Sequence, residues 1–402
     1  MLGGIIALGI LGGLGARSEV CAATIDTWTG PGRFPVGVIT TQVVDRTRST
    51  PSNPFACQTC CPGSPSRLLN TDVYYPAASG TPGIKVQGAP LDTHDGRFPL
   101  LVFAHGLASR TAFVDTLVHL ASHGYVVVAP DFPLTNTATA LAGCEYRADL
   151  VNQPGDVSFE IDTFTGIGDS PGGAFAGVVD GSAVGVVGHS LGGDTALLAG
   201  FGGPLADPRL KAAAAVAPGP SCFASPMFAS TRPLPFVIFH GTSDQIVSPT
   251  SNREPYPLML PPKFQVEIVG GDHTGFESGL GPLRDPDVIP ILNALPIPGG
   301  LAAQNAALHA ALLAKVPGAD LDLTPCVFRT FTATTTTLIP KAEQVRITNG
   351  ALTAFFDAFL RQDRGARRFF LRLSRRTAFG REVRFCKSPR RSRPCHLPPL
   401  PS

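Results

Sequence analysis

A serine between two glycines is the clearest candidate nucleophile in the chain. Ser190 is the centre of a Gly-His-Ser-Leu-Gly sequence that follows small β-branched residues and precedes a helical pattern rich in Ala and Leu. A strand that turns at once into a helix strains the residue at the bend and leaves no room for Cβ atoms beside it. Gly188 and Gly192 supply that room. The pattern predicts a hydroxyl at a helix N-terminus, where developing negative charge is favoured.

A serine at its ordinary pKa needs a base, and the base needs a group that orients it. His273 follows the apolar segment FQVEIV through a Gly-Gly turn, and Asp244 follows the apolar segment LPFVIF. If these segments are parallel strands, their carboxyl ends meet at one edge of a sheet. The order Ser190, Asp244, His273 is the Ser…acid…His order of one known arrangement of the catalytic triad. We therefore predict that these three residues are catalytic.

Other histidines and carboxylates near these positions fit the same roles less well. His189 precedes the serine and is expected to point away at the bend, and His240 is expected to be structural. Asp272 is adjacent to His273, whereas the orienting acid must come from elsewhere in the chain. Asp194 lies inside the helix after the serine, where a capping or surface carboxylate is expected.

Acyl transfer also requires donors for the oxyanion. The segment PLLVFA ends in His-Gly-Leu-Ala-Ser ahead of a helical pattern, and one backbone N–H is expected from that loop. The other is expected from the residue after the nucleophile. This reasoning nominates Leu107 and Leu191, with Gly106 and Ala108 as alternatives for the first donor.

The elements that must position these residues are apolar segments separated by helical patterns. Segments without polar alternation are typical of parallel strands covered on both faces. They occur at 98–106, 125–133, 182–190, 210–219, 234–244 and 264–273. This order predicts an α/β fold with a mainly parallel central sheet and helices on both faces. We expect one domain over residues 24–362, with residues 277–345 as an insertion or cap near the active site.

Composition and the N-terminus indicate an exported globular protein. Of the 402 residues, 44% are hydrophobic and 15% are charged, which excludes a disordered chain. Residues 1–23 contain an uncharged apolar run followed by small residues, and they predict a signal peptide and a secreted or periplasmic protein. No positive charge precedes the apolar run, so an uncleaved anchor or a misassigned start stays open.

The nine cysteines suit an oxidising compartment. Cys57, Cys60 and Cys61 lie close together, but zinc would need a second close pair or nearby histidines, and the nearest histidine is His94. Disulfides or spare thiols are the better interpretation, with the pairing left open. No metal and no cofactor are predicted.

The C-terminal residues are strongly basic. Between 361 and 402, thirteen Arg and Lys residues stand against two acidic ones, so the remaining body is mildly acidic. Residues 363–402 are expected to be a disordered or mistranslated extension, and contact with anionic membranes is the alternative. A nucleic-acid partner is not predicted.

Together these segments resemble the α/β-hydrolase superfamily, particularly the secreted platelet-activating-factor acetylhydrolase and dienelactone-hydrolase-like group and the related cutinase-type polyester hydrolases. The resemblance covers residues 36–276 and the helical pattern near 351–361. It is carried by LNTDVYYPA, LLVFAHG, LASHGYVVVAPDFP, VGVVGHSLGG, FHGTSDQIV and GGDHTGF. It implies the α/β-hydrolase fold and hydrolysis of carboxylic esters without cofactor or metal.

Within that resemblance, Ser190 would be the nucleophile, His273 the base and acid, and Asp244 its orienting group. Dienelactone hydrolases proper use cysteine, so their substrate is not expected here. The resulting prediction is a secreted serine esterase that forms an acyl-enzyme on a lipid-like or short-acyl ester. The alternatives are an amide or peptide hydrolase with the same triad, and a non-catalytic binding protein on this scaffold. Oligomeric state is not predicted.

Overall fold

The computed structural model describes most of the chain between residues 25 and 388. The described ranges are 25–107, 109–166, 171–175, 177–219, 232–253, 255–316, 332–373, 375 and 378–388. The predicted signal peptide, residues 1–23, lies outside them.

Among these residues, ten strands form one sheet in the order β10-β9-β8-β7-β6-β4-β5-β2-β1-β3. The strands are β1 (Val36–Asp45), β2 (Arg67–Pro76), β3 (Lys85–Gln87), β4 (Phe98–Ala104), β5 (Val126–Asp131), β6 (Val179–His189), β7 (Leu210–Val216), β8 (Phe236–Gly241), β9 (Lys263–Ile268) and β10 (Val383–Ser388). Pairing is parallel from β5 through β4, β6, β7 and β8 to β9. Strand β2 pairs antiparallel with both β5 and β1. The predicted mainly parallel sheet is confirmed.

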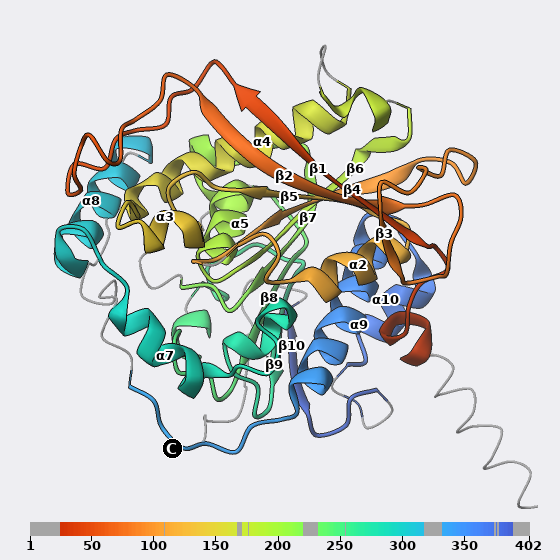
Figure 1. Ribbon diagram of the computed structural model, residues 1–402. Helices are drawn as coiled ribbons and strands as arrows, with labels where there is room; N and C mark the ends of the chain where they lie inside the picture. The colour runs from red at the N-terminus through yellow and green to blue at the C-terminus, as the bar shows by residue number, and fades with distance from the viewer. Residues whose placement is uncertain are drawn as a thin grey trace, which may run out of the picture.

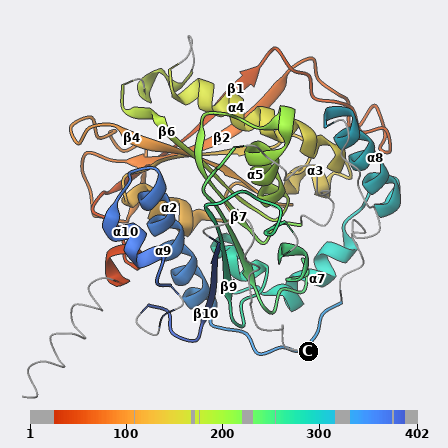
Figure 2. The ribbon, with the colours of Figure 1, turned by 180° about the vertical axis from the view of Figure 1, so that it is seen from behind.

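Helices cover both faces of the sheet (Figures 1 and 2). On β4, Leu101 and Phe103 belong to a core shared with α2 (Val114–Ser122) and α9 (Lys341–Phe359). The alternate residues Leu100 and Val102 belong to a second core, shared with α4 (Gln153–Phe164) and α5 (Leu191–Phe201). Because successive side chains of a strand point to opposite faces, two covered faces require an uninterrupted apolar strand. This is why the central strands lack polar alternation.

The expectation of a disordered tail is wrong for the described residues 363–373, 375 and 378–388. Helix α10 (Arg364–Phe370) follows α9, and β10 pairs antiparallel with β9. Phe369 and Phe370 are buried, and Trp28 stacks on Phe369 with ring centroids 4.7 Å apart. The excess of basic residues suggested disorder, but the apolar residues among them are buried and order the segment. Residues 389–402 lie outside the described residues, and membrane contact by the basic tail stays a prediction.

The segment predicted as a cap contains α7 (Asp285–Ala294) and α8 (Gly300–Lys315), which lie apart from the α2–α9 layer (Figure 1). Its residues 317–331 lie outside the described residues. That this segment is an insertion stays a prediction. In the described part of the chain, no helix combines the length and the apolar character needed to cross a membrane.

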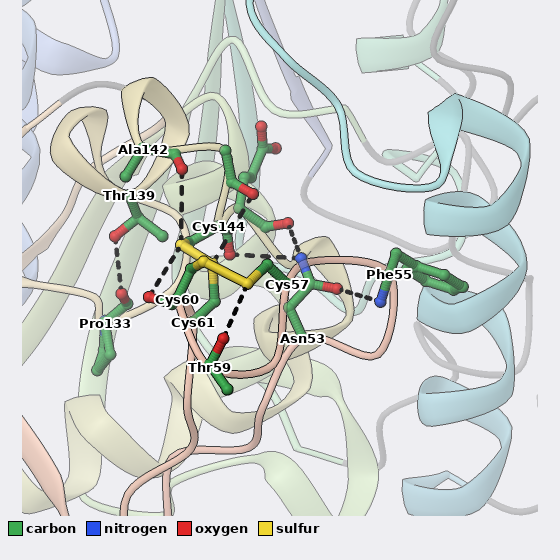
Figure 3. Close-up of a disulfide and its surroundings, with 12 residues drawn as sticks. Asn53, Phe55, Cys57, Thr59, Cys60, Cys61, Pro133, Thr139, Ala142 and Cys144 are labelled. Atoms are coloured by element: carbon green, nitrogen blue, oxygen red, sulfur yellow. Dashed lines mark hydrogen bonds between the residues drawn. A yellow bond between two sulfur atoms is a disulfide. The ribbon is translucent and has the colours of Figure 1, made fainter.

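Two disulfides, Cys57–Cys60 and Cys61–Cys144, lie side by side on the loop between β1 and β2 (Figure 3). The second disulfide joins this loop to the turn after α3 (Thr137–Leu141). Phe55 on the same loop contacts the residues before α8, since a Cβ on Gly299 would lie 2.7 Å from Phe55 Cγ. The disulfide-linked loop therefore supports both α3 and the start of α8.

We predict that loss of the Cys61–Cys144 disulfide lowers the free energy of unfolding by about 2–4 kcal/mol, because it closes a long loop in the unfolded chain. The two cysteines are 83 positions apart. The measurement is urea unfolding of the double Cys→Ala variant without reductant. The Cys57–Cys60 disulfide spans 3 positions and is the matched control, with a smaller expected loss. An equal or larger loss in the control variant would contradict the prediction.

Candidate active site

Ser190 occupies a strained bend between β6 and α5. Its backbone has φ 54° and ψ −123°, a conformation that costs free energy for a residue with a side chain. A Cβ on Gly188 would collide with the carbonyl of Gly192, and a Cβ on Gly192 would collide with that of Ala104. The two glycines flanking the serine are therefore required by close backbone packing, as the sequence indicated.

Asp244 and His273 form a buried hydrogen-bonded pair. His273 Nδ1 lies 2.9 Å from Asp244 Oδ2, and the two residues are 4% and 7% exposed, respectively. Asp244 Oδ1 accepts backbone N–H groups from Ile246 and Val247, at 2.9 and 2.7 Å. Asp244 follows β8 and His273 follows β9, so the predicted acid and base come from the ends of neighbouring parallel strands. Because both aspartate oxygens are used, the carboxylate is fixed in orientation.

The environment of His273 favours its protonated form. Burial, the largest effect, disfavours the imidazolium, but the charge and hydrogen bond of Asp244 act in the opposite direction. The carboxylates of Asp285 and Glu277 add to this, and together they raise the pKa of His273 to about 9. The neighbouring carboxylates therefore stabilise a proton on this imidazole.

The predicted site residues meet at one cavity. Ser190, His273, Leu107 and Leu191 all line a cavity of about 280 Å³, and Asp244 reaches it through His273. The loop after β4 passes directly over the serine, since a Cβ on Gly106 would lie 2.8 Å from Ser190 Cβ. The structure thus brings all five residues together, although their catalytic roles stay a prediction.

A buried histidine holds the loop that carries Leu107. His105 Nε2 accepts the backbone N–H of Phe132 at 2.9 Å, and its Nδ1 contacts the carbonyl of Gly106 at 2.7 Å. These bonds match a neutral imidazole that donates from Nδ1 and accepts at Nε2, and burial lowers the pKa of His105 accordingly. The sequence marked His105 only as a polar residue at the end of an apolar segment.

Asp285 is a functional candidate that sequence reasoning missed. It lies at the start of α7 and is fully buried, and its Oδ2 accepts the backbone N–H groups of Gln245 and His273. Its Oδ1 accepts both the N–H and the hydroxyl of Thr274. The Asp285 carboxylate therefore connects the loop that carries Asp244 to the loop that carries His273. Burial, followed by the nearby charge of Asp244, raises the pKa of Asp285 to about 6. The sequence holds no signal for this role, because the Asp-Pro pair is typical of any helix start.

The residues set aside in the sequence analysis have other partners. Asp272 is paired with Arg284 at 2.7 Å, and His240 with Glu267 at 3.1 Å. His189 does not line the cavity, but it is not remote from the site. Its ring packs on His273 with centroids 4.5 Å apart, and its Nδ1 lies 3.2 Å from Glu277 Oε1.

The expectation of a capping or surface carboxylate at Asp194 is wrong. The side chain is 3% exposed and accepts the backbone N–H of Gly219 at 2.7 Å. It lies on α5, a helix whose residues are all buried, so no side of the helix offers a surface position.

The cavity wall is mainly apolar. Leu191 belongs to it, whereas the phenylalanines Phe132 and Phe276 are buried and do not line it. The other apolar lining residues come from α3, from the loop after Asp244 and from the predicted cap. They are Leu141, Ile246, Val247, Leu280, Leu283, Val288, Ile291, Leu292, Leu295, Ile297 and Leu301.

Comparison with known proteins agrees with the fold. Residues 89–223, about a third of the chain, match the profile of the chlorophyllase family. A solved structure of a ferulic acid esterase from Streptomyces cinnamoneus is similar with a TM-score of 0.57 and 21% sequence identity, covering 88% of this chain and 97% of that one. No curated protein sequence matches significantly. These matches leave the resemblance to platelet-activating-factor acetylhydrolases untested. The sheet order, the strained serine and these matches together show that the chain has the α/β-hydrolase fold.

Proposed function

We propose that the protein is a secreted serine esterase that acts through an acyl-enzyme. The observation that carries this proposal is the buried Asp244–His273 pair, which shares one cavity with the strained Ser190. The chlorophyllase-family match and the similarity to a ferulic acid esterase support ester bonds as the substrate.

In the proposed reaction, Ser190 Oγ attacks the ester carbonyl while His273 Nε2 takes the hydroxyl proton. The backbone N–H groups of Leu107 and Leu191 stabilise the oxyanion, each contributing about 10²–10³-fold in rate. His273 then donates its proton to the leaving alcohol. A water molecule attacks the acyl-enzyme with His273 again as the base, which releases the acid and restores the serine.

The cavity supports an ester with an apolar acyl or alcohol part. Its wall is mainly aliphatic, and an apolar group that leaves water for such a wall gains about 25 cal/mol per Å² of buried area. The two disulfides support export, because disulfides persist in oxidising compartments.

Replacement of Ser190 by Ala tests the proposal directly. We expect wild-type protein to hydrolyse p-nitrophenyl butyrate faster than the matched p-nitroanilide. We expect S190A to lose about 10⁴–10⁶-fold in kcat, because alanine has no hydroxyl with which to form the acyl-enzyme. The control is S182A, which removes an exposed hydroxyl on the same strand. Full activity of S190A, or no ester turnover by folded wild-type protein, would overturn the proposal.

The pH dependence follows from the raised pKa of His273. Because the base must be neutral, kcat/KM should rise with pH and reach half its maximum near pH 9. Asp244→Asn removes the negative charge that raises this pKa, so the residual activity should have its midpoint about 1–3 pH units lower. Initial rates corrected for spontaneous hydrolysis provide the measurement, with D115N, an exposed change on α2, as the control. An unchanged midpoint in D244N would contradict this account.

Asp285→Asn should remove hydrogen bonds that hold the loops carrying Asp244 and His273 in place. The side-chain amide of Asn has one acceptor oxygen where Asp285 has two. Buried N–H groups on the other side therefore lose their partner, and each loss lowers the free energy of unfolding by about 1–3 kcal/mol. We expect the free energy of unfolding in urea to fall by about 2–4 kcal/mol and kcat to fall with little change in KM. Asp287→Asn, an exposed change on the same helix, should alter stability by less than about 1 kcal/mol. Equal effects of the two substitutions would rule out the tie between the loops.

A further inference from the structure

The mainly apolar cavity has one ion pair in its wall whose role the proposed reaction does not explain. Glu145 and Arg147 both line the cavity, together with Thr137 and Leu141 of α3 and Leu301 of α8. This wall is separate in sequence from the strand ends that carry the triad. An ion pair buried in an apolar wall costs desolvation free energy, so its presence calls for an explanation.

One carboxylate oxygen of Glu145 has no partner in the part of the chain that the structure describes. Its side chain is 1% exposed, and its Oε1 accepts a hydrogen bond from Arg147 Nε at 2.7 Å. Its Oε2 is buried and has no hydrogen-bond partner among the described residues. A buried acceptor without a donor is unfavourable by about 1–3 kcal/mol. A carboxylate with an unpaired oxygen, on a residue that lines the substrate cavity, is suited to a donor that arrives with the substrate.

The backbone around this carboxylate is fixed from several sides. Asn53 Nδ2 and Gln304 Nε2 both donate to the carbonyl of Glu145, at 2.6 and 3.0 Å. Gln304 Oε1 accepts the N–H of Arg147 at 3.0 Å. The preceding residue, Cys144, is in the disulfide to Cys61, next to Asn53 in Figure 3. The carboxylate is therefore held in place before any substrate binds, which is typical of a recognition group.

The pair with Arg147 determines which donor suits the site. The guanidinium neutralises the carboxylate, so a cationic substrate would gain little net attraction and would lose its own hydration. A neutral hydroxyl can donate one hydrogen bond to Oε2 while the rest of the substrate contacts aliphatic side chains. Such a charge-assisted bond also penalises an analogue without the hydroxyl, because the oxygen would stay unpaired.

We propose that Glu145 is a specificity-determining residue that accepts a hydrogen bond from a hydroxyl group on the apolar part of the ester substrate. The proposal rests on the esterase function and names its substrate class as hydroxylated apolar esters. Glu145 takes no part in bond making or breaking. Its effect is therefore expected in the preference between substrates and not in the chemistry itself.

The test compares p-nitrophenyl esters of ω-hydroxy acids of six, eight and ten carbons, and of 4-hydroxycinnamic acid, with their counterparts that lack the hydroxyl. The readout is the ratio of kcat/KM within each pair, which does not depend on the fraction of folded enzyme. For the best-fitting pair, this ratio should fall at least about tenfold in E145M/R147M relative to wild type. The double variant removes both charges of the Glu145–Arg147 pair together and preserves an apolar wall.

Leu301→Met is the matched control, because it changes the shape of the same wall without changing its polarity. Its ratio should stay within about twofold of the wild-type ratio, as expected of a volume-conserving swap. A ratio in E145M/R147M equal to that of wild type would overturn the proposal. A stronger preference of wild type for ω-amino esters than for ω-hydroxy esters would also overturn it.

Binding of the product acids separates this proposal from the esterase proposal. Calorimetric titration with hydroxylated and plain acids measures the same preference without turnover. If folded wild-type protein hydrolyses none of the esters, the esterase proposal fails, and the ratio of the two dissociation constants still tests Glu145. A ratio that E145M/R147M leaves unchanged would overturn the proposal in that case as well.

Discussion

The hydrogen-bond requirement of a buried carboxylate organises this site. Asp244 satisfies it with two backbone N–H groups on one oxygen and the imidazole of His273 on the other. Asp285 satisfies it with donors from both neighbouring loops. Each buried carboxylate therefore specifies the position of the loops around it, because any displacement leaves charge without a partner. The base acquires its orientation and its raised pKa from the same arrangement.

The topology of the sheet makes this convergence possible. Strands β6, β8 and β9 run parallel, with β7 between the first two, so the residues that follow them lie along one edge. The serine is held there by backbone packing against β4, and the acid and base by hydrogen bonds. The cavity is lined by residues of α3, α7 and α8. The Cys61–Cys144 disulfide attaches the turn after α3, Gln304 attaches α8 to Glu145 and Arg147, and Asp285 attaches the start of α7 to the loops after β8 and β9. In the proposed reaction, residues at the sheet edge carry out the chemistry, and the covering helices determine the substrate preference.

The sequence predicted the residues whose roles are local and missed those whose roles depend on distant partners. Ser190 is marked by its flanking glycines, and Asp244 and His273 by the apolar strands before them. Asp285 carries no such mark, because its donors lie elsewhere in the chain. Glu145 carries none either, because its place in the cavity wall comes from the fold and not from a local pattern. Helix α10 and strand β10 were missed because their buried phenylalanines depend on packing against Trp28 and β9.

The central claim is that Ser190 is made nucleophilic by the imidazole and carboxylate that converge beside it. Peptide mapping by mass spectrometry after treatment with a fluorophosphonate tests it most directly, because the reagent bonds to activated serines. The account predicts one modified residue, Ser190, and loss of that modification in His273→Gln. Modification at another serine instead, or none in folded wild-type protein, would contradict it.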